Sequence, residues 1–312
     1  MSVPAAYLGV ILIWATTPLA IQWSGEGPGF LFGVAARMAI GTVLALAVAR
    51  LCGVRVWRRD ALVVYAVVGL GIYGAMLSTY WAAQQIPSGW ISVIFGFTPI
   101  ATGAMAALWL PGQGLTRVRL AGALLGAGGL AAIFGGGASA HGQAAAGIAA
   151  VLLATLIHAA SAVWTKRLGA HVRPLALVAG GLALSTPLLV ATWAVFDGNW
   201  PASLPERALA SILYLGVIGS VLGFSLYYYV LGRVDATRVA LITLITPVAA
   251  LLLGHRLNDE PLSLLVVSGA GLVITGLAVF ELGDRVARSV PPMELRIRSE
   301  TEDRDETPAE RA

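Results

Sequence analysis

The feature that most constrains this chain is a succession of apolar runs, each long enough to cross a lipid bilayer. A hydrocarbon core about 30 Å thick needs about 20 apolar residues in a helix. Ten such runs follow one another with short connections, at residues 5–23, 30–51, 61–83, 88–110, 118–135, 145–165, 174–196, 209–231, 237–255 and 261–282. A composition of 58% hydrophobic and 12% charged residues agrees with this pattern. The sequence therefore predicts an all-α integral membrane protein with ten transmembrane helices.

The basic residues are divided unequally between the two sets of loops. Apart from Arg37, which lies inside the second run, 17 of them fall on one side of the membrane and only 2, Arg207 and Arg256, on the other. Short cytoplasmic loops accumulate Lys and Arg, so we expect both termini in the cytoplasm. The start MSVPAA lacks the basic n-region of a cleaved signal peptide, so we expect the first run to be retained as a span. Because this excess follows the topology and forms no basic stripe with aromatic residues, we expect no nucleic-acid partner.

The chain also contains an internal repeat. The stretches YGAMLSTYWAAQQIPSGWISVIFGFTPIATGA from Tyr73 and VLGFSLYYYVLGRVDATRVALITLITPVAALL from Val221 align without a gap at a shift of 148 residues. Each half holds five runs, and because five is odd, the second half enters the membrane in the opposite orientation. Inverted repeats of this kind can exchange roles around a site near the membrane midplane. We therefore divide the chain into a first repeat at 1–135, a second at 145–283 and a disordered cytoplasmic tail at 284–312.

The two halves resemble EamA modules of the drug/metabolite transporter superfamily. The resemblance covers about residues 5–282 and is carried by LIWA at 12–15, Arg37, YWAA at 80–83 leading to Ser88 and Pro99, YYVLGRVDAT at 228–237 leading to Pro247, and GAG at 269–271. It implies a ten-helix carrier, similar to bacterial inner-membrane exporters of amino acids and related metabolites. The glutamate that commonly follows the fourth span of each module is missing here, since LWLPG at 108–112 has none and His255 takes its second position.

Each proline inside the runs is preceded by a threonine. A helical proline leaves the carbonyl four residues earlier without its partner, and the threonine hydroxyl is within range of that carbonyl. Two of these pairs also correspond across the repeat, so we interpret Thr98, Pro99, Thr246 and Pro247 as a hinge. Simple bending of the helices is the alternative interpretation.

Polar and aromatic side chains inside the runs are the candidates for contacting a substrate: Trp14, Thr17, Arg37, Tyr73, Tyr80, Gln84, His158, Trp164 and Tyr228. Arg37 is the one formal charge well inside a run, and three interpretations stay open for it: an anchor for a substrate carboxylate or phosphate, a donor to backbone carbonyls of a neighbouring helix, or a side chain that snorkels to the interface. For His158, a hydrogen-bonded place in the helix packing is the alternative to a titrating role.

These residues favour transport over catalysis. Because no run carries Asp or Glu at mid-depth, the carboxylate typical of a proton-coupled carrier is missing. We expect a facilitative exporter of amino acids, including aromatic or other neutral ones, and related small metabolites in the bacterial inner membrane. A proton-coupled antiporter is the alternative, and a channel or an intramembrane enzyme represents the other classes, although the common hydrolase motifs are missing. We expect no cofactor, no metal and a monomer in the lipid bilayer.

Overall fold

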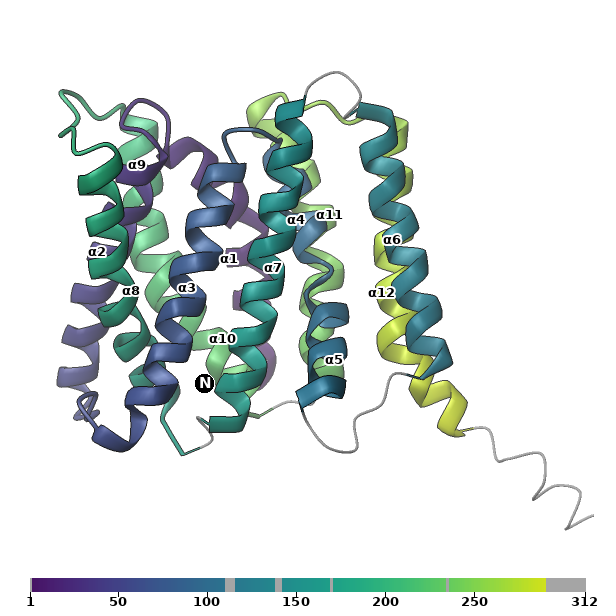
Figure 1. The fold of residues 1–312 in the computed structure, drawn as a ribbon, viewed down its shortest axis with the longest axis horizontal. Coiled ribbons are helices and arrows are strands. Elements are labelled where there is room, and N and C mark those ends of the chain that lie inside the picture. The colour runs from purple at the N-terminus through teal and green to yellow at the C-terminus, as the bar shows by residue number, and fades with distance from the viewer. Residues whose placement is uncertain (1, 110–115, 138–141, 169–170, 234–235, 290–312) are drawn as a thin grey trace, which may run out of the picture.

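The computed structural model describes residues 2–109, 116–137, 142–168, 171–233 and 236–289, and every regular element in them is helical (Figure 1). The 3-10 turn η1 precedes α3, and the π-helix η3 joins α9 to α10. In chain order the elements are α1 Val3–Ser24, α2 Phe30–Leu51, η1 Arg59–Ala61, α3 Leu62–Ala82, α4 Ser88–Phe95, α5 Thr98–Trp109, α6 Arg117–Gly137, α7 Gly142–Leu168, α8 Pro174–Phe196, α9 Glu206–Tyr214, η3 Leu215–Gly223, α10 Phe224–Leu231, α11 Ala236–Asn258 and α12 Leu264–Ser289.

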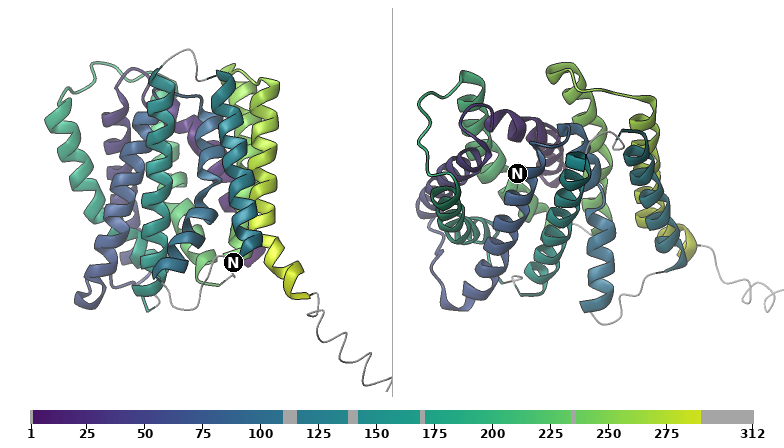
Figure 2. Two further views of the ribbon diagram at one scale, coloured as in Figure 1. Left: turned by 45° about the vertical axis from the view of Figure 1, so that its right-hand side comes forward. Right: turned by 45° about the horizontal axis from the view of Figure 1, so that its top comes forward.

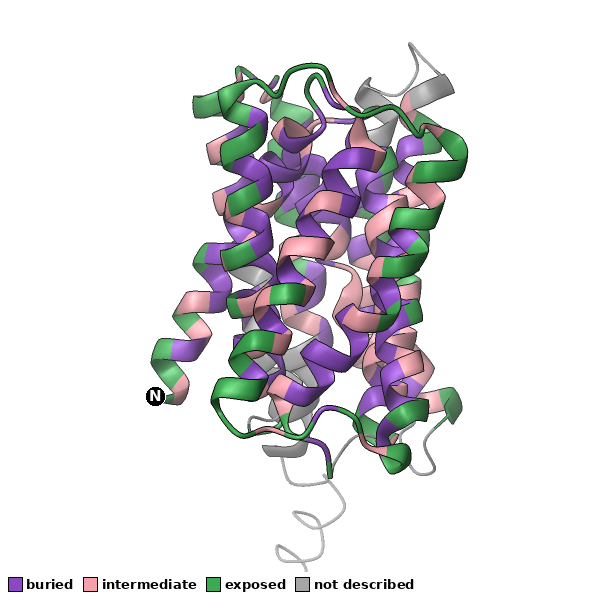
Figure 3. Ribbon diagram, turned by 90° about the vertical axis from the view of Figure 1, so that its left-hand side faces the viewer, coloured by how far each residue is buried: buried purple, intermediate pink, exposed green. Residues whose placement is uncertain are grey.

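The helices have the length and the surface of membrane spans. Within the described residues, seven helical stretches are long and apolar enough to cross a bilayer, and Leu264–Phe280 is a shorter apolar helix. Large apolar side chains face outward, as Leu12 and Val43 do at 69% and 68% exposure. Figure 3 shows the buried positions turned inward and the exposed ones on the outer faces and end loops. The prediction of an all-α membrane protein is confirmed, and the count of ten spans stays a prediction.

The two ends of the described chain lie on the same side of the bundle. In Figure 1 the N-terminus and the last turn of α12 are both at the lower end. Helix α12 runs past Asp284 to Ser289, so the first residues of the expected tail are helical, and residues 290–312 lie outside the described part. A cytoplasmic position for this lower end stays a prediction from the basic residues.

Corresponding elements of the two halves have nearly matching bounds but differ in local structure. A shift of 148 residues places Ala236, the first residue of α11, on Ser88, the first residue of α4. However, the chain between α4 and α5 leaves the helix at Gly96–Phe97, whereas α11 continues through the matching residues 244–245. Likewise η3 is π-helical, whereas the matching residues 67–75 belong to the regular helix α3. The two repeats therefore adopt different conformations at corresponding positions.

The expectation that each threonine covers the carbonyl freed by its own proline holds for one of the three pairs whose hydrogen bonds the structure gives. Thr98 Oγ1 donates to the Phe95 carbonyl at 2.6 Å. Thr17 Oγ1 instead donates to the Ile13 carbonyl at 2.6 Å, one residue before the expected partner. Thr186 Oγ1 turns to the neighbouring helix and donates to the Met38 carbonyl at 3.1 Å. The acceptor in that case comes from the neighbouring helix α2.

Helices α6 and α12 pack side by side along one edge of the bundle (Figures 1 and 2). Glycines let their backbones approach: a methyl group added at Gly276 would lie 2.5 Å from the Gly126 amide nitrogen and 2.6 Å from the Gly122 carbonyl oxygen. Small residues allow this close approach of membrane helices. Gly122 and Gly126, four residues apart on α6, therefore serve the contact with α12.

Substitution of Gly276 should therefore destabilise the pair. We expect Gly276→Val to cost about 1–3 kcal/mol, because the added side chain forces the backbones apart, and to lower the Tm of the purified protein in detergent by at least about 2 °C. Gly271→Val on the same helix is the matched control, since a methyl group there meets no atom within 4 Å. Equal Tm values for the two variants would contradict this account of the α6–α12 contact.

Candidate functional site

Aromatic rings from four helices meet inside the bundle. The Trp14 ring on α1 lies 5.1 Å from the Tyr227 ring on α10 and 6.4 Å from the His158 ring on α7. His158 is also 5.8 Å from Tyr227 and 6.4 Å from Phe95, the last residue of α4. Tyr228 packs on Tyr227 at 5.1 Å. We call these five residues the aromatic cluster.

Both repeats contribute to the aromatic cluster. Trp14 and Phe95 come from the first half, and His158, Tyr227 and Tyr228 from the second. Phe95 is followed at once by the break between α4 and α5, where a methyl group added at Gly96 would lie 3.7 Å from Pro247 of α11. Backbone that leaves the helix at membrane depth is tolerated where it is covered by protein or lines a cavity. Because Phe95 directly precedes this break and Gly96 lies near Pro247, the aromatic cluster is beside the place where the predicted hinge segments around Pro99 and Pro247 meet.

His158 belongs to the aromatic cluster through ring contacts. Its side chain is partly exposed, and none of the hydrogen bonds in the described part of the chain involves its imidazole. The alternative of a histidine fixed by hydrogen bonds in the helix packing is thus not what the described residues show. Aromatic faces of this kind bind apolar or aromatic groups, and they attract cations through the ring quadrupole.

Arg37 lies buried between α2, α3 and η3. It is 2% exposed, which rules out the snorkelling interpretation. Its Nε donates to Ser220 Oγ at 3.1 Å, and its Nη1 lies 3.5 Å from the Tyr80 hydroxyl. The ion pairs of the described residues lie elsewhere, on Asp60 and Glu26. The guanidinium is therefore held by neutral groups in this part of the chain, although a guanidinium has five N–H donors to satisfy.

The π-helix η3 connects Arg37 with the aromatic cluster. A methyl group added at Gly219 would lie 3.3 Å from Arg37 Nη2, and one added at Gly223 would lie 4.0 Å from Trp14 Nε1. Short π-helical segments inside α-helices occur frequently at functional sites. Because glycines stand at both contacts, η3 leaves room beside the guanidinium at one point and beside the indole N–H at the other.

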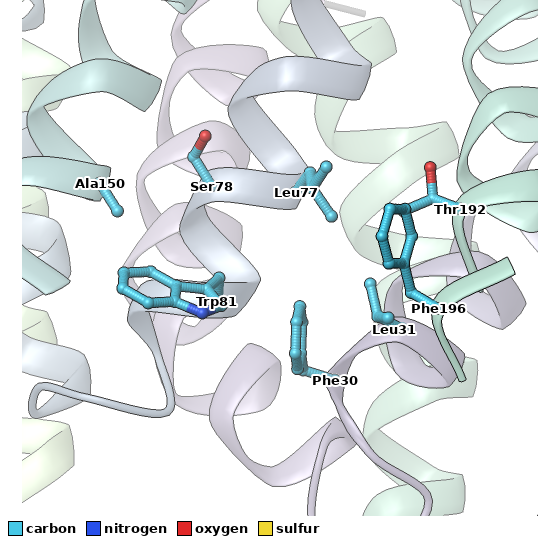
Figure 4. A pocket seen from close by; sticks show the side chains of 8 residues that line it. All are labelled: Phe30, Leu31, Leu77, Ser78, Trp81, Ala150, Thr192 and Phe196. Carbon is cyan, nitrogen blue, oxygen red and sulfur yellow. The ribbon is translucent and has the colours of Figure 1, made fainter. Parts of the chain in front are cut away.

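A separate groove of about 410 Å³ lies between α2, α3, α7 and α8 (Figure 4). It shares no residue with the aromatic cluster. Tyr73 Oη lies 3.0 Å from Oγ1 of Thr192, one of the lining residues, so this predicted site residue bridges α3 and α8 beside the groove. The lining is apolar apart from two hydroxyls and one indole N–H: Phe30, Leu31, Leu77, Ser78, Trp81, Ala150, Thr192 and Phe196. It suits an apolar group better than a charged one.

Comparison with known proteins decides the family. The model of the EamA-like transporter family matches residues 3–135 and again residues 145–282. The chain belongs to the EamA-like transporter family. As a member of it, this protein is a multi-pass membrane transporter, and its helical bundle contains two EamA repeats.

Individual relatives of this EamA-like transporter have transport names. A probable terminal-alkyne amino-acid exporter of Streptantibioticus cattleyicolor is 29% identical over 298 residues, which cover 89% of this chain and 97% of the relative. An uncharacterized inner membrane transporter of Escherichia coli strain K12 is 24% identical over 284 residues, covering 89% and 90%. A solved structure shares the fold, with a TM-score of 0.67 and 24% identity, covering 92% of this chain and 98% of the other.

The sequence-predicted residues of this EamA-like transporter fall into different environments. Trp14, His158 and Tyr228 come together in the aromatic cluster, and Tyr80 lies with Arg37. The other four predicted positions make no ring contact with the aromatic cluster, and Tyr73 lies beside the separate groove. Gln84 is exposed in the turn beyond α3, Trp164 packs on Trp109 at 5.7 Å, and Thr17 bonds within its own helix.

Two members of the aromatic cluster were not predicted from the sequence. Phe95 has no polar atom, and its importance comes from its place at the end of α4. Tyr227 stands next to Tyr228 in the run LYYY at 226–229, and successive residues of an α-helix point in different directions, about 100° apart. The repeat alignment selected Tyr228 by its match with Tyr80, whereas Tyr227 makes the ring contacts with both Trp14 and His158.

Proposed function

We propose that this transporter exports amino acids, including aromatic or other neutral ones, and related small metabolites by alternating access between its two repeats. The observation that carries the proposal is the aromatic cluster, built by both repeats beside the break between α4 and α5. A substrate held there contacts both halves at once, as an exchange of their conformations requires. The name of the Streptantibioticus cattleyicolor relative, an amino-acid exporter, points to the same substrate class.

The chemistry of the two neighbouring sites fits a zwitterion with an apolar side chain. The rings of Trp14, His158 and Tyr227 take the apolar or aromatic side chain, and their faces attract the substrate ammonium group. Arg37 supplies the positive charge for the carboxylate, because its guanidinium is buried without an acidic partner in the described residues. A planar guanidinium suits a carboxylate through paired N–H donors.

We further propose that export is facilitative. The acidic residues of the described chain lie in loops, near helix ends or in the last third of α12, where Glu281 and Asp284 stand, and none of them belongs to the aromatic cluster. His158 is the member of the aromatic cluster whose side-chain type ordinarily titrates near neutral pH, and it makes proton-coupled antiport the second candidate. We place the lower end of the bundle in Figure 1 in the cytoplasm, from the distribution of the basic residues. One chain supplies both halves of the site, so we expect a monomer.

A counterflow assay in proteoliposomes tests this function. The panel contains labelled aromatic, branched and hydroxy amino acids, sugars and organic cations, each with and without a pH gradient. We expect saturable counterflow of neutral amino acids, most strongly the aromatic ones, and the same rate in both conditions. Counterflow of sugars alone would contradict the substrate class, dependence on the gradient would establish the antiporter, and flux without saturation would indicate a channel.

The conformational difference between the repeats supports a hinge at Pro99 and Pro247. In alternating access, the second repeat adopts the conformation that the first now has, so α11 would break near Pro247 while α4 and α5 join. Proline costs a helix interior about 3 kcal/mol, which keeps the continuous form of α11 from becoming too stable. Pro247 is inside α11, and Pro99 lies in the first turn of α5.

We therefore expect Pro247→Ala and Pro99→Ala to slow counterflow about three- to tenfold while the amount of protein in the membrane stays nearly unchanged. Removing the proline stabilises the continuous helix, and the exchange of conformations becomes slower. Pro187→Ala is the control, because Pro187 lies inside α8, which has no break at the corresponding place in either half. Unchanged counterflow in both hinge variants would rule out the hinge.

A further inference from the structure

A buried carboxylate caps a half-helix from a distant part of the chain. Glu260, in the turn after α11, accepts N–H bonds from the backbone of Ser88 at 2.9 Å and Gly89 at 3.1 Å, in the first turn of α4. The residue before α4, Pro87, provides no side-chain cap. The first N–H groups of a helix have no partner within it, and the positive end of the helix dipole stabilises a carboxylate there. Glu260, which is 9% exposed, supplies both the acceptor for these N–H groups and the negative charge at the positive end of the dipole.

The turn after α11 is shaped to direct Glu260 toward α4. Asp259 has a φ of 50°, the left-handed conformation that reverses the chain. The Glu260 N–H donates to the Gly254 carbonyl at 3.2 Å, and His255 Nδ1 lies 2.9 Å from the Glu260 carbonyl oxygen. Gly254 also leaves space for the carboxylate, since a methyl group added there would collide with it.

The same carboxylate is connected to α1. Asn258 Nδ2 lies 3.3 Å from Glu260 Oε1 and 3.3 Å from Gln22 Oε1, and Trp23 Nε1 donates to Asn258 Oδ1 at 2.9 Å. We call Gln22, Trp23, Asn258 and Glu260 the Glu260 network. It joins α1, α4 and α11 at the upper end in Figure 1, opposite the N-terminus.

These three helices also carry the candidate substrate site. Helix α4 has only 8 residues, so a shift of its capped end moves Phe95 at its other end. Trp14 lies on α1, and Pro247 lies on α11. The first repeat has no counterpart of the carboxylate, because the stretch LPGQG at 110–114, which contains the position matching Glu260, has no acidic residue.

We propose that Glu260 is a positioning residue that holds this end of the bundle closed. It releases α4 when the transporter opens at this end. The proposal rests on alternating access and on the orientation that makes this end the outer one. Because the carboxylate cap is present at one end and has no counterpart in the other repeat, it favours the state that is closed outside and open to the cytoplasm. An exporter collects its substrate from that side, so the bias agrees with export.

A thiol-labelling experiment tests the proposal without any substrate. Cys52, the single cysteine of the chain, is replaced by serine, and Ser92→Cys on α4 places a reporter at a position that is 6% exposed. A membrane-impermeant methanethiosulfonate reagent is added from the outside of intact cells. We expect labelling at least about tenfold faster in Glu260→Ala and Glu260→Gln, because bonds to a charged acceptor are lost from the closed state. Glu206→Ala, at an exposed glutamate in the first turn of α9, should label at the parent rate.

The outcomes separate the closing role from a simple structural cap. Equal labelling rates in the Glu260 variants and in Glu206→Ala overturn the proposal, even if the Glu260 variants have a lower Tm. If Glu260→Ala does not accumulate in the membrane, Asn258→Ala replaces it, since it removes the connection between Glu260 and α1. We expect a several-fold faster labelling there, and an unchanged rate again overturns the proposal. Failure of amino-acid counterflow, by contrast, bears on the proposed substrate and leaves the labelling result intact.

Discussion

Replacement of Trp14 by leucine is expected to lower the initial rate of amino-acid counterflow about five- to thirtyfold, because loss of ring contacts worth about 1–2 kcal/mol weakens substrate binding by that factor. Trp14 contacts both His158 and Tyr227, so this ring of the first repeat touches two members of the aromatic cluster from the second repeat. Leucine keeps an apolar side chain at the position and limits the loss of packing. Counterflow of labelled phenylalanine, normalised to the amount of reconstituted protein, measures the effect.

Trp164→Leu is the matched control for Trp14→Leu. Both tryptophans are partly exposed and lie on the corresponding first helices of the two repeats, but Trp164 packs on Trp109 and has no ring contact with the aromatic cluster. We expect less than about a twofold loss of counterflow in this variant, the size of an ordinary surface change. An equal loss in both variants would mean that the aromatic cluster is not the place where substrate binds.

The bounds of the spans could be predicted from the sequence more closely than the inner faces of the helices. The second predicted span, 30–51, coincides with α2, and the seventh, 174–196, coincides with α8. These bounds follow from the apolar runs and from the turn residues between them. The inward faces could not be predicted in the same way, because helices that are apolar on all sides have no hydrophobic stripe to mark their orientation. The sequence therefore predicts one site for Tyr73, Trp164, Trp14 and His158, whereas the first two lie elsewhere in the structure.

Two local features that shape the site had no recognisable signal in the sequence. Pro99 predicted a bend inside one helix, but the chain stops the helix at Phe95 and begins another at Thr98, which places Phe95 at a helix end. The π-helix η3 contains Gly216, Gly219 and Gly223, and glycines in a membrane span predict close packing in general, with no indication of π-helical bonds. Both features depend on tertiary contacts that the local sequence does not specify.

The sequence lacks the family glutamate at its usual position, yet the structure places another carboxylate in the same region. His255 takes the family position, and Glu260, five residues later, reaches back to α4 through the left-handed turn at Asp259. Glu260 and Ser88 are 172 residues apart in the sequence, so the spacing gives no indication that they are in contact. Only the packing of α11 against α4 brings the carboxylate to the two N–H groups.

Substitution of Arg37 should have an effect that depends on the charge of the substrate. We expect Arg37→Gln to lower counterflow of neutral amino acids about 30-fold or more, since loss of one partner of a buried charge pair costs about 2–5 kcal/mol. Amino-acid amides, which lack the carboxylate, should be transported at nearly the same low rate by the parent and the variant. Arg37→Lys keeps the charge but loses the planar pair of donors, so we expect an intermediate loss.

Ser220→Ala distinguishes a substrate anchor from a purely structural guanidinium. This variant removes the 3.1 Å bond from Arg37 Nε and leaves the charge in place, so we expect only about a fivefold loss for amino acids, the worth of one hydrogen bond. If Arg37 acts only in helix packing, Arg37→Gln will instead lower the transport of amino acids and amides by the same factor, in step with the amount of folded protein. The ratio of the two substrates is therefore the decisive measurement, because a loss of folded protein cancels from it and the loss of a carboxylate contact does not.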